Sequence, residues 1–303
     1  TRAAARPRGR VLASAAALLA FGLAGHRLLP RRGGLATVWE ALLPWTAVLV
    51  IALAVLALLR RSPVAAVGVL VAALVWSAMF LPQVLPSRSA GTADLVVAAQ
   101  NIEAANGSAV AAAQALVASG AQVVAVQEIA RSASGVAEVL DRQFPHRVRT
   151  GTVGVWSAYP LADSEGVDLG VNWVRGLHVT LRAPAGDVSL YAVHLPSVRP
   201  GKEQRRDRGL ARLAEQVAAD ASPRVVVMGD LNTPSTDRSF RLLTGELADS
   251  RQSVRGGFGF TWPAGAPLVR LDHVMLRGVR AVSDDVLAAN GSDHRAVRVG
   301  IAF

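Results

Sequence analysis

Hydrophobic residues follow different patterns in the first 85 residues and in the rest of the chain. Three apolar runs of 18 or 19 residues come first: Val11–Leu29, Leu42–Leu59 and Val64–Leu81. As helices they would each be about 28 Å long, close to the roughly 30 Å hydrocarbon core of a bilayer. The second and third runs contain no charged residue, and tryptophans flank the second, as is common at membrane interfaces. We therefore predict a membrane domain of three transmembrane helices in residues 1–85.

Two other interpretations of these runs remain open. Buried helices of a soluble core are also apolar, although three such long runs together favour membrane spans. The first run is also compatible with a cleavable signal peptide, because the basic stretch TRAAARPRGR precedes it. Two further runs follow and no convincing A-x-A cleavage site does, so a retained helix is favoured.

The arginines next to the runs indicate an orientation. With the N-terminus inside, the cytoplasmic flanks contain Arg2, Arg6, Arg8, Arg10, Arg60 and Arg61, and the other side contains Arg27, Arg31, Arg32 and Arg88. This bias of six against four follows the tendency of basic residues to stay inside. We expect a multi-pass protein of the cell membrane, whose chain after Leu85 lies outside the cytoplasm.

Beyond a short linker, residues 86–92, apolar strands alternate with amphipathic helices. The predicted strands are Leu95–Gln100, Val123–Gln127, Thr152–Ser157, Leu177–Arg182, Val188–His194, Arg224–Gly229, Leu271–Leu276 and Ala296–Phe303. The predicted helices are Ser108–Ser119, Ser134–Gln143, Gly201–Asp220 and Ser235–Leu243. The turn sequence APAGD predicts a hairpin between the fourth and fifth strands. Residues 93–303 are thus expected to form an α/β sandwich with helices covering its sheets.

Charge is divided unequally between the two regions. The chain carries a formal net charge of +10. Residues 1–89 hold ten of the 32 Lys and Arg residues but only one of the 22 acidic residues, Glu40, which leaves 22 basic and 21 acidic residues for the rest. The near-neutral polar domain therefore does not demand a nucleic-acid partner. Cysteine is absent, which excludes disulfides, Cys-ligated zinc and a thiol nucleophile.

Reactive residues stand at the ends of most predicted strands. They lie in QNI (Asn101), VQE (Glu128), VHLPS (His194), GDLN (Asp230 and Asn232), LDH (Asp272) and SDH (Asp293 and His294). In an extended strand, the spacing of Asp230 and Asn232 would place both side chains on one side. Each residue alone has an ordinary explanation as a turn former, a helix cap or a structural histidine. The joint pattern is harder to explain without a site.

This set of motifs resembles the endonuclease/exonuclease/phosphatase superfamily, the DNase I-like metal-dependent phosphohydrolases. The resemblance covers roughly Leu95 to Phe303, and GDLN with a C-terminal SDH is its most specific part. It implies a DNase I-like α/β sandwich with two packed mixed sheets flanked by helices. Three apolar helices before such a domain resemble the membrane-anchored bacterial members, some of which are teicoplanin-resistance membrane proteins.

The candidate metal ligands are Glu128, as the principal ligand, and Asn101. A hard cation such as Mg²⁺ keeps several waters and takes only one or two protein carboxylates, and the resemblance implies the same assignment. Asp293 is expected to bind the metal or one of its waters. Mn²⁺ is an alternative cation, and the choice between one metal and two stays open.

The remaining candidates are catalytic. His294 is expected to act as a general base or to polarise the phosphate, and the resemblance implies that Asp272 orients it. Asp230 could position or deprotonate the attacking water, and Asn232 could donate to a phosphoryl oxygen. His194 resembles the second histidine of DNase I-like members, which donates to the phosphate or the leaving group.

Four features outside these motifs have two interpretations each. Trp262 either walls the substrate pocket or belongs to the core. Arg175 is expected to be solvated, with a phosphate contact as the alternative. The run RPGKEQRRDR, residues 199–208, is expected to be a solvated helix start, with an anionic contact as the alternative. His273 should point away from Asp272 and be structural.

The leading hypothesis is a membrane-anchored, metal-dependent phosphohydrolase that acts on a phosphoester or diphosphate at the membrane surface. A lipid-linked diphosphate of the cell envelope would suit that location. The alternatives are a membrane-tethered nuclease with the same chemistry and an inactive binding or sensory domain on a membrane anchor.

Overall fold

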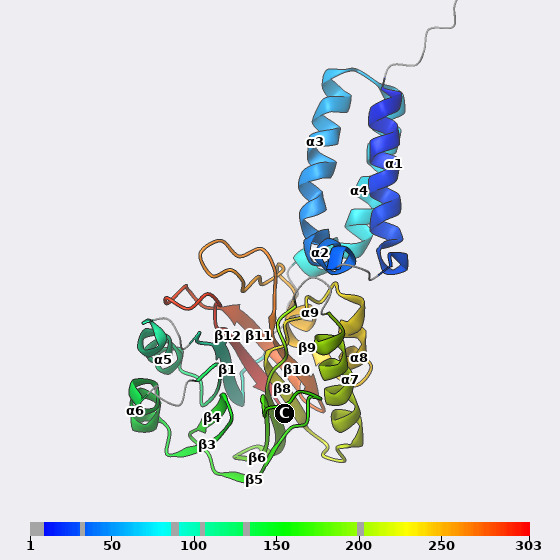
Figure 1. Ribbon diagram of the computed structural model, residues 1–303. Helices are drawn as coiled ribbons and strands as arrows, with labels where there is room; N and C mark the ends of the chain where they lie inside the picture. The colour runs from blue at the N-terminus through cyan, green and yellow to red at the C-terminus, as the bar shows by residue number, and fades with distance from the viewer. Residues whose placement is uncertain (1–8, 31–33, 86–90, 104–106, 130–133, 199–202) are drawn as a thin grey trace, which may run out of the picture. The chain divides into compact units, whose positions relative to one another are not determined.

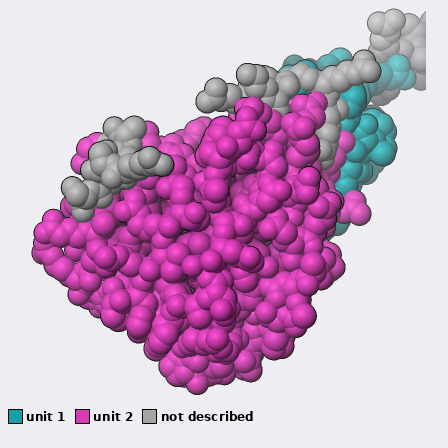
Figure 2. Space-filling model, turned by 60° about the horizontal axis from the view of Figure 1, so that its bottom comes forward, with its two compact units in different colours: residues 1–85 teal, residues 86–303 magenta. Residues whose placement is uncertain are grey.

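The computed structural model describes residues 9–30, 34–85, 91–103, 107–129, 134–198 and 203–303. The chain forms two compact units, Thr1–Leu85 and Pro86–Phe303, which are drawn as ribbons in Figure 1 and coloured separately in Figure 2. The predicted linker, residues 86–92, lies mostly outside the described residues, as do most of the arginines used to predict the orientation.

The first unit is helical. Its elements are α1 (Arg10–Ala24), η1 (His26–Leu28), α2 (Leu35–Leu42), η3 (Leu43–Trp45), α3 (Thr46–Leu59) and α4 (Pro63–Val84). Helix α4 begins with Pro63 behind a Ser62 cap, whose hydroxyl accepts from the Ala65 amide at 3.2 Å. A Cβ atom on Gly68 would lie 3.1 Å from the carbonyl oxygen of Ala13. The glycine thus permits the close approach of α1 and α4.

Two continuous helical segments are long and apolar enough to cross a membrane, Leu35–Leu59 and Pro63–Val84. The first predicted span forms only the 15-residue helix α1, which ends at Ala24 and is followed by Gly25 and a short 3-10 turn. The prediction of three spans is therefore supported for two of them, by length and composition. Large side chains on both segments are exposed, including Leu58 at 74% and Leu74 at 60%, unlike those of a soluble core helix.

The second unit is a two-sheet sandwich. Its strands are β1 (Leu95–Asn101), β2 (Val123–Gln127), β3 (His146–Thr150), β4 (Val153–Ser157), β5 (Leu161–Gly166), β6 (Gly176–Ala183), β7 (Gly186–His194), β8 (Val225–Asp230), β9 (Ala248–Asp249), β10 (Asp272–Arg277), β11 (Arg280–Val286) and β12 (Val297–Ala302). One sheet has the order β11-β12-β1-β2-β4-β3 and the other β5-β6-β7-β8-β10-β9. The pairs β1–β2 and β7–β8 are parallel and the remaining pairs are antiparallel. Both sheets are thus mixed, as predicted.

Helices cover the outer faces of both sheets, as Figure 1 shows. They are α5 (Ala109–Ala118), α6 (Ser134–Gln143), α7 (Glu203–Ala219), η4 (Arg238–Phe240), α8 (Arg241–Thr244) and α9 (Ser250–Val254). Three apolar clusters result: one between the sheets, one under α5 and α6, and one under α7 and α8. Side chains alternate between the two faces of each strand, and most of the valines in these strands are buried.

All eight predicted strands form, but β3, β5, β9 and β11 were not predicted. Strand β3, HRVRT, alternates charged and apolar residues, and β5 and β11 carry exposed acidic residues, so none has an apolar run. Strand β9 has only two residues. The predicted helix Ser235–Leu243 is shorter and begins as a 3-10 turn, because the Asp237 carboxylate caps it by accepting from the Ser239 amide at 2.7 Å.

Candidate active site

The two parallel strand pairs end at the site. Asn101 is the last residue of β1, and Glu128 directly follows β2, its parallel neighbour. In the other sheet, His194 ends β7 and lies opposite Asp230 at the end of β8. The antiparallel strand β10 starts at Asp272, which pairs with Asp230 from the other side. The register of the strands therefore brings together residues that lie up to 171 positions apart.

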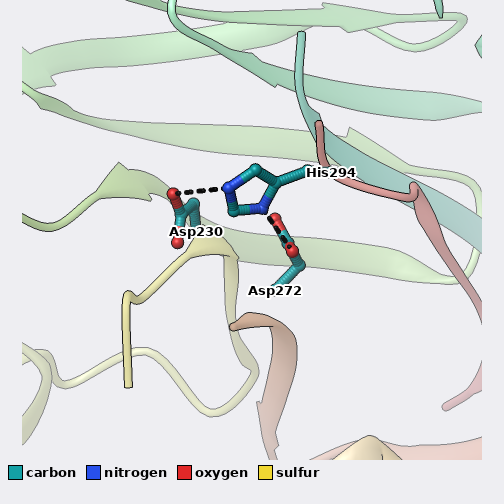
Figure 3. A group of neighbouring side chains, drawn as sticks. All are labelled: Asp230, Asp272 and His294. Atoms are coloured by element: carbon teal, nitrogen blue, oxygen red, sulfur yellow. Dashed lines mark hydrogen bonds and ion pairs between the residues drawn. The ribbon is translucent and has the colours of Figure 1, made fainter. Parts of the chain in front are cut away.

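His294 lies between two buried carboxylates, as Figure 3 shows. Its Nδ1 donates to Asp272 Oδ2 at 2.8 Å, and its Nε2 lies 3.9 Å from Asp230 Oδ2. All three residues are buried, and one ligand atom from each lies within 4.8 Å of the others. Because the Asp272 oxygen already accepts from the ring, the arrangement is an acid–histidine pair facing a second acid.

Burial and neighbouring charges shift the pKa values of His294 and Asp230. Burial acts against a charged His294, but the carboxylate of Asp272 and its hydrogen bond raise the pKa of the imidazole well above its usual range, with Asp230 contributing. Burial, with Asp272 adding, raises the pKa of Asp230 well above that of an ordinary aspartate. An imidazolium beside a carboxyl group with a raised pKa is an arrangement suited to proton transfer and to binding an anion.

Oxygen ligands for a cation gather around Asn101. Its Nδ2 is 3.1 Å from Glu128 Oε1 and 3.2 Å from Asp230 Oδ2, so two carboxylates from different sheets converge on one amide. Asp272 Oδ1 is buried and has no hydrogen-bond partner within the described chain. Glu128 has a left-handed φ of 59°, which turns its side chain out of the strand direction. Clustered acidic oxygens of this kind fit a hard divalent cation such as Mg²⁺ or Mn²⁺.

Arg175 adds a positive charge to the site and contacts His194. Arg175 NH2 lies 2.6 Å from His194 Nε2, and the ring is 3.5 Å from Asp230 Oδ2 and 3.6 Å from Glu128 Oε1. Burial, Arg175 and His294 lower the pKa of His194 well below its usual value and so disfavour the charged ring. The expectation that Arg175 is solvated is wrong, because its guanidinium is half-buried and its Nε has no partner within the described chain.

Asp230 and Asn232 converge, but not through strand alternation. Strand β8 ends at Asp230, and Asn232 has a left-handed φ of 46°. The side-chain Nδ2 of Asn232 donates to Asp230 Oδ2 at 3.0 Å and to the Leu195 carbonyl oxygen at 2.9 Å. Both of its amide hydrogens thus have acceptors, which leaves none for a phosphoryl oxygen. Asn232 orients Asp230 in this structure.

Asp293 and Trp262 lie at the rim of the site. Trp262 Nε1 donates to Asp293 Oδ2 at 3.2 Å, and the indole is 39% exposed, so the interpretation of Trp262 as a core residue is wrong. Asp293 is exposed and raises the pKa of His294 through its charge. It does not join the buried group of Asp230, Asp272 and His294 among the residues described.

Several supporting residues were not predicted. Ser292 Oγ donates to the Asn101 carbonyl oxygen at 2.7 Å and accepts from the His294 amide at 3.1 Å, which links the two ends of the domain. Gln100 and Asn290 form a reciprocal amide pair beside it. The serine of GSDH was a visible signal. Gln100 was visible in QNI, but nothing in the sequence indicated its partner.

Comparison with known proteins gives a consistent result. Residues 98–294 match the model of the Endonuclease/Exonuclease/phosphatase family, and no curated protein sequence matches the chain. Among solved structures, D. rerio TDP2 complexed with single strand DNA product is 17% identical, with a TM-score of 0.59 over 69% of this chain and 99% of that one. An endonuclease/exonuclease/phosphatase from Bacteroides vulgatus is 16% identical, with a TM-score of 0.58 over 69% and 98%.

The beta toxin of Staphylococcus aureus is 14% identical, with a TM-score of 0.51 over 68% of this chain and 99% of that one. These likenesses show the predicted DNase I-like fold. The family model covers well over half of the chain and includes every site residue from Asn101 to His294. The chain therefore belongs to the endonuclease/exonuclease/phosphatase family.

Proposed function

We propose that this protein is a membrane-anchored, divalent-metal-dependent phosphohydrolase that cleaves a phosphoester or diphosphate by attack of an activated water. One observation carries the proposal: the Glu128 and Asp230 carboxylates converge on Asn101 beside the buried His294–Asp272 pair. Hydrolysis of a phosphoester needs a positioned water and neutralisation of phosphoryl charge, and this site has groups for both.

The roles follow from the contacts. Glu128 and Asn101 would hold Mg²⁺, or Mn²⁺, with Asp293 near one of its waters, and the bound cation would neutralise the phosphoryl oxygens. Asp230, oriented by Asn232, would position and deprotonate the water. His294, held by Asp272, would polarise the phosphate as an imidazolium.

On the other side of the site, His194 and Arg175 would donate to the phosphate or to the leaving oxygen. The buried Arg175 Nε without a partner is a donor that an anion could satisfy. Trp262 would wall the substrate pocket at the rim, next to Asp293.

A substrate at the membrane surface is favoured by the make-up of the whole chain. Two exposed apolar helices precede the catalytic unit, and ten residues separate the end of α4 from β1. Residues 90–303 are nearly neutral. A lipid-linked diphosphate of the cell envelope, reached by an extracytoplasmic domain, fits a short tether and a domain of near-zero net charge better than a long polyanion does.

The second candidate function is a membrane-tethered nuclease with the same chemistry. The similarity in fold to D. rerio TDP2, which was solved with a single strand DNA product, favours it. A nuclease would lose activity steeply as salt rises, because its phosphate contacts release counterions. The third is an inactive sensory domain, which would show no metal-stimulated turnover.

The deciding experiment uses the full chain purified in detergent. Phosphate release with Mg²⁺ from an undecaprenyl-type diphosphate and nicking of plasmid DNA are measured side by side. His294→Ala is the inactive control. His178→Gln is the matched control, because His178 hydrogen-bonds to Glu165 and Ser189 and packs against Tyr191, away from the site.

Release from the lipid that His294→Ala abolishes and His178→Gln keeps, without nicking, would support the lipid phosphatase. Nicking without lipid turnover would support the nuclease instead. No metal-stimulated activity on either substrate or on bis(p-nitrophenyl) phosphate would leave the inactive domain as the better account.

A further inference from the structure

The chain directly after Asp230 is held by two buried side chains, those of Arg206 and His273. Arg206 NH1, on α7, donates to the Asn232 carbonyl oxygen at 3.0 Å and to Thr233 Oγ1 at 3.1 Å. His273 Nε2, on β10, lies 3.0 Å from the Thr233 carbonyl oxygen. Consecutive peptide groups of the segment that carries Asn232 are thus each bound from outside the strand.

Acidic side chains fix both of these residues, and the Nε of Arg206 also donates to Asp207 Oδ1 at 2.9 Å. Arg206 NH2 donates to Asp237 Oδ2 at 2.6 Å, and His273 Nδ1 lies 2.8 Å from Asp249 Oδ2. Both ring nitrogens of His273 thus face oxygen atoms, one of Asp249 and one of the Thr233 backbone. Arg206, His273, Asp237 and Asp249 are all at most 3% exposed. A buried charge is costly unless it is paired, so these pairs need an explanation.

The two pairs lie behind the site rather than in it. Successive residues of β10 point to opposite faces, so Asp272 faces His294 while His273 faces Asp249 and the Asp230–Thr233 segment. Residues 199–208 were predicted to form a solvated helix start. This prediction is wrong for Arg206, which is 1% exposed. Residues 199–202 lie outside the described part of the chain.

The held segment makes a left-handed turn at Asn232. Asn232 adopts a left-handed φ of 46°, a region that is uncommon for non-glycine residues but that asparagine tolerates better than most. In this conformation the backbone N–H of Asn232 donates to Asp230 Oδ1 at 2.8 Å, and its side-chain Nδ2 donates to Asp230 Oδ2. The orientation of the Asp230 carboxylate therefore depends on the backbone that Arg206 and His273 hold.

We propose that Arg206 and His273 are positioning residues: by binding the carbonyl oxygens of Asn232 and Thr233, they hold the Asp230 carboxylate in its working orientation. The inference rests on the proposed hydrolytic function. Neither residue touches the substrate side of the site, so their loss should lower kcat and leave KM nearly unchanged.

The test compares Arg206→Met and Arg206→Lys with Arg277→Met, in the full chain in detergent, using bis(p-nitrophenyl) phosphate and Mg²⁺. Arg277 is a matched control, because it also donates to backbone carbonyl oxygens, those of Val217, Asp220 and Ser222, at the other end of β10. Thr233→Val is a milder second variant that removes one acceptor of Arg206 without leaving a buried charge.

We expect Arg206→Met to lower kcat by about 30- to 100-fold with KM within about threefold, since misplacement of a catalytic group by about 1 Å can cost about 100-fold. Arg206→Lys should recover part of the loss, Thr233→Val should lower kcat by about three- to tenfold, and Arg277→Met should stay within about twofold. If Arg206→Met and Thr233→Val match Arg277→Met in kcat, the proposal is wrong.

Hydrogen exchange separates this proposal from the proposed function. If the wild-type chain hydrolyses neither this probe nor the two substrates above, the proposed function fails, and exchange in the peptide Val225–Ser235 decides. Exchange at least about tenfold faster in Arg206→Met than in Arg277→Met would support the holding role. Equal exchange would overturn it.

Discussion

At the scale of single residues, Asp230 and Asp272 have different tasks although they lie opposite each other on β8 and β10. Asp272 accepts directly from His294, whereas Asp230 accepts from Asn101 and Asn232 and lies 3.9 Å from the imidazole. Asp272 therefore orients His294 and favours its charged form, whereas Asp230 is left for the water-positioning role proposed above.

Replacing Asp272 by Asn tests that division. The variant keeps the shape of the side chain but loses the negative charge that stabilises the His294 imidazolium. We expect kcat to fall by about 10²- to 10⁴-fold, as when the acid of another acid–histidine pair is made neutral. Initial rates with bis(p-nitrophenyl) phosphate measure this. Asp220→Asn, outside the site, should retain activity, and equal rates for the two variants would contradict the assignment.

At the scale of elements, the connection from α7 to β8 is tied to β7 by one acid. Asp220 accepts from Ser189 Oγ at 2.5 Å, from Tyr191 OH at 3.0 Å and from the Ser222 amide at 2.8 Å. Burial opposes ionisation of this carboxyl, but the hydrogen bonds from Ser189 and Ser222 lower its pKa to about 2. The connection is thus held by a carboxylate that stays charged.

Asp220→Asn should lower the free energy of unfolding by about 1–3 kcal/mol at pH 7, because the hydrogen bonds to a charged group weaken. The folded-state pKa lies below that of an unfolded aspartate, so the stabilisation is present above about pH 4 and is lost as the pH falls toward 2. Urea unfolding in detergent at pH 7 and pH 3, followed by tryptophan fluorescence, should show a smaller difference between wild type and variant at pH 3. A constant difference would count against this account.

Near the end of β8, Gly229 lies against the backbone of the neighbouring strand β7. Its φ is 134°, and a Cβ atom would lie 2.1 Å from the Val193 carbonyl oxygen on β7. The close approach of these parallel strands is what places His194 opposite Asp230.

Gly229→Ala should therefore lower the free energy of unfolding by about 2–4 kcal/mol through backbone strain and the contact with Val193. Gly245→Ala is the control, because Gly245 has helical φ and ψ and its added Cβ would meet nothing closer than 4.0 Å. That change should be neutral or stabilise by up to about 1 kcal/mol. Similar losses for both variants in urea unfolding would refute the prediction.

At the scale of the whole molecule, apolar surface and charge are segregated. The helical unit exposes large apolar side chains and carries most of the net positive charge, while the sandwich unit is nearly neutral. This division is typical of a protein whose first unit lies in lipid, with arginines near the ends of its spans.

The absence of cysteine makes the predicted orientation easy to test. A single cysteine replaces Gln252, which is exposed in the catalytic unit, or Arg60, between α3 and α4. A membrane-impermeant maleimide should label Gln252→Cys in intact cells, and Arg60→Cys only after the cells are permeabilised. The reverse pattern would invert the orientation, and labelling of both variants in intact cells would argue against membrane spans.

Much of the fold and the candidate site could be predicted from the chain alone. Strands such as VVVMGD are apolar throughout because both of their faces are buried, and Asp230 follows such a run in plain view. Strand β3 was missed because one of its faces meets solvent and carries arginines. Arg175 and Arg206 look like surface residues in the sequence. Nothing in their local sequence indicates that Arg175 contacts the buried His194 or that Arg206 donates to the carbonyl oxygen of Asn232.

The sequence by itself determined the order of the elements, the family motifs and the segregation of apolar helices from a polar sandwich, because these depend on local composition and periodicity. Only the tertiary structure decided which polar groups meet. Strand register placed Asp230 between His194 and Asp272, and the left-handed turn at Asn232, held by Arg206 and His273, directed its carboxylate. Register and hydrogen bonding act between residues far apart in the chain, so no short stretch of sequence records them.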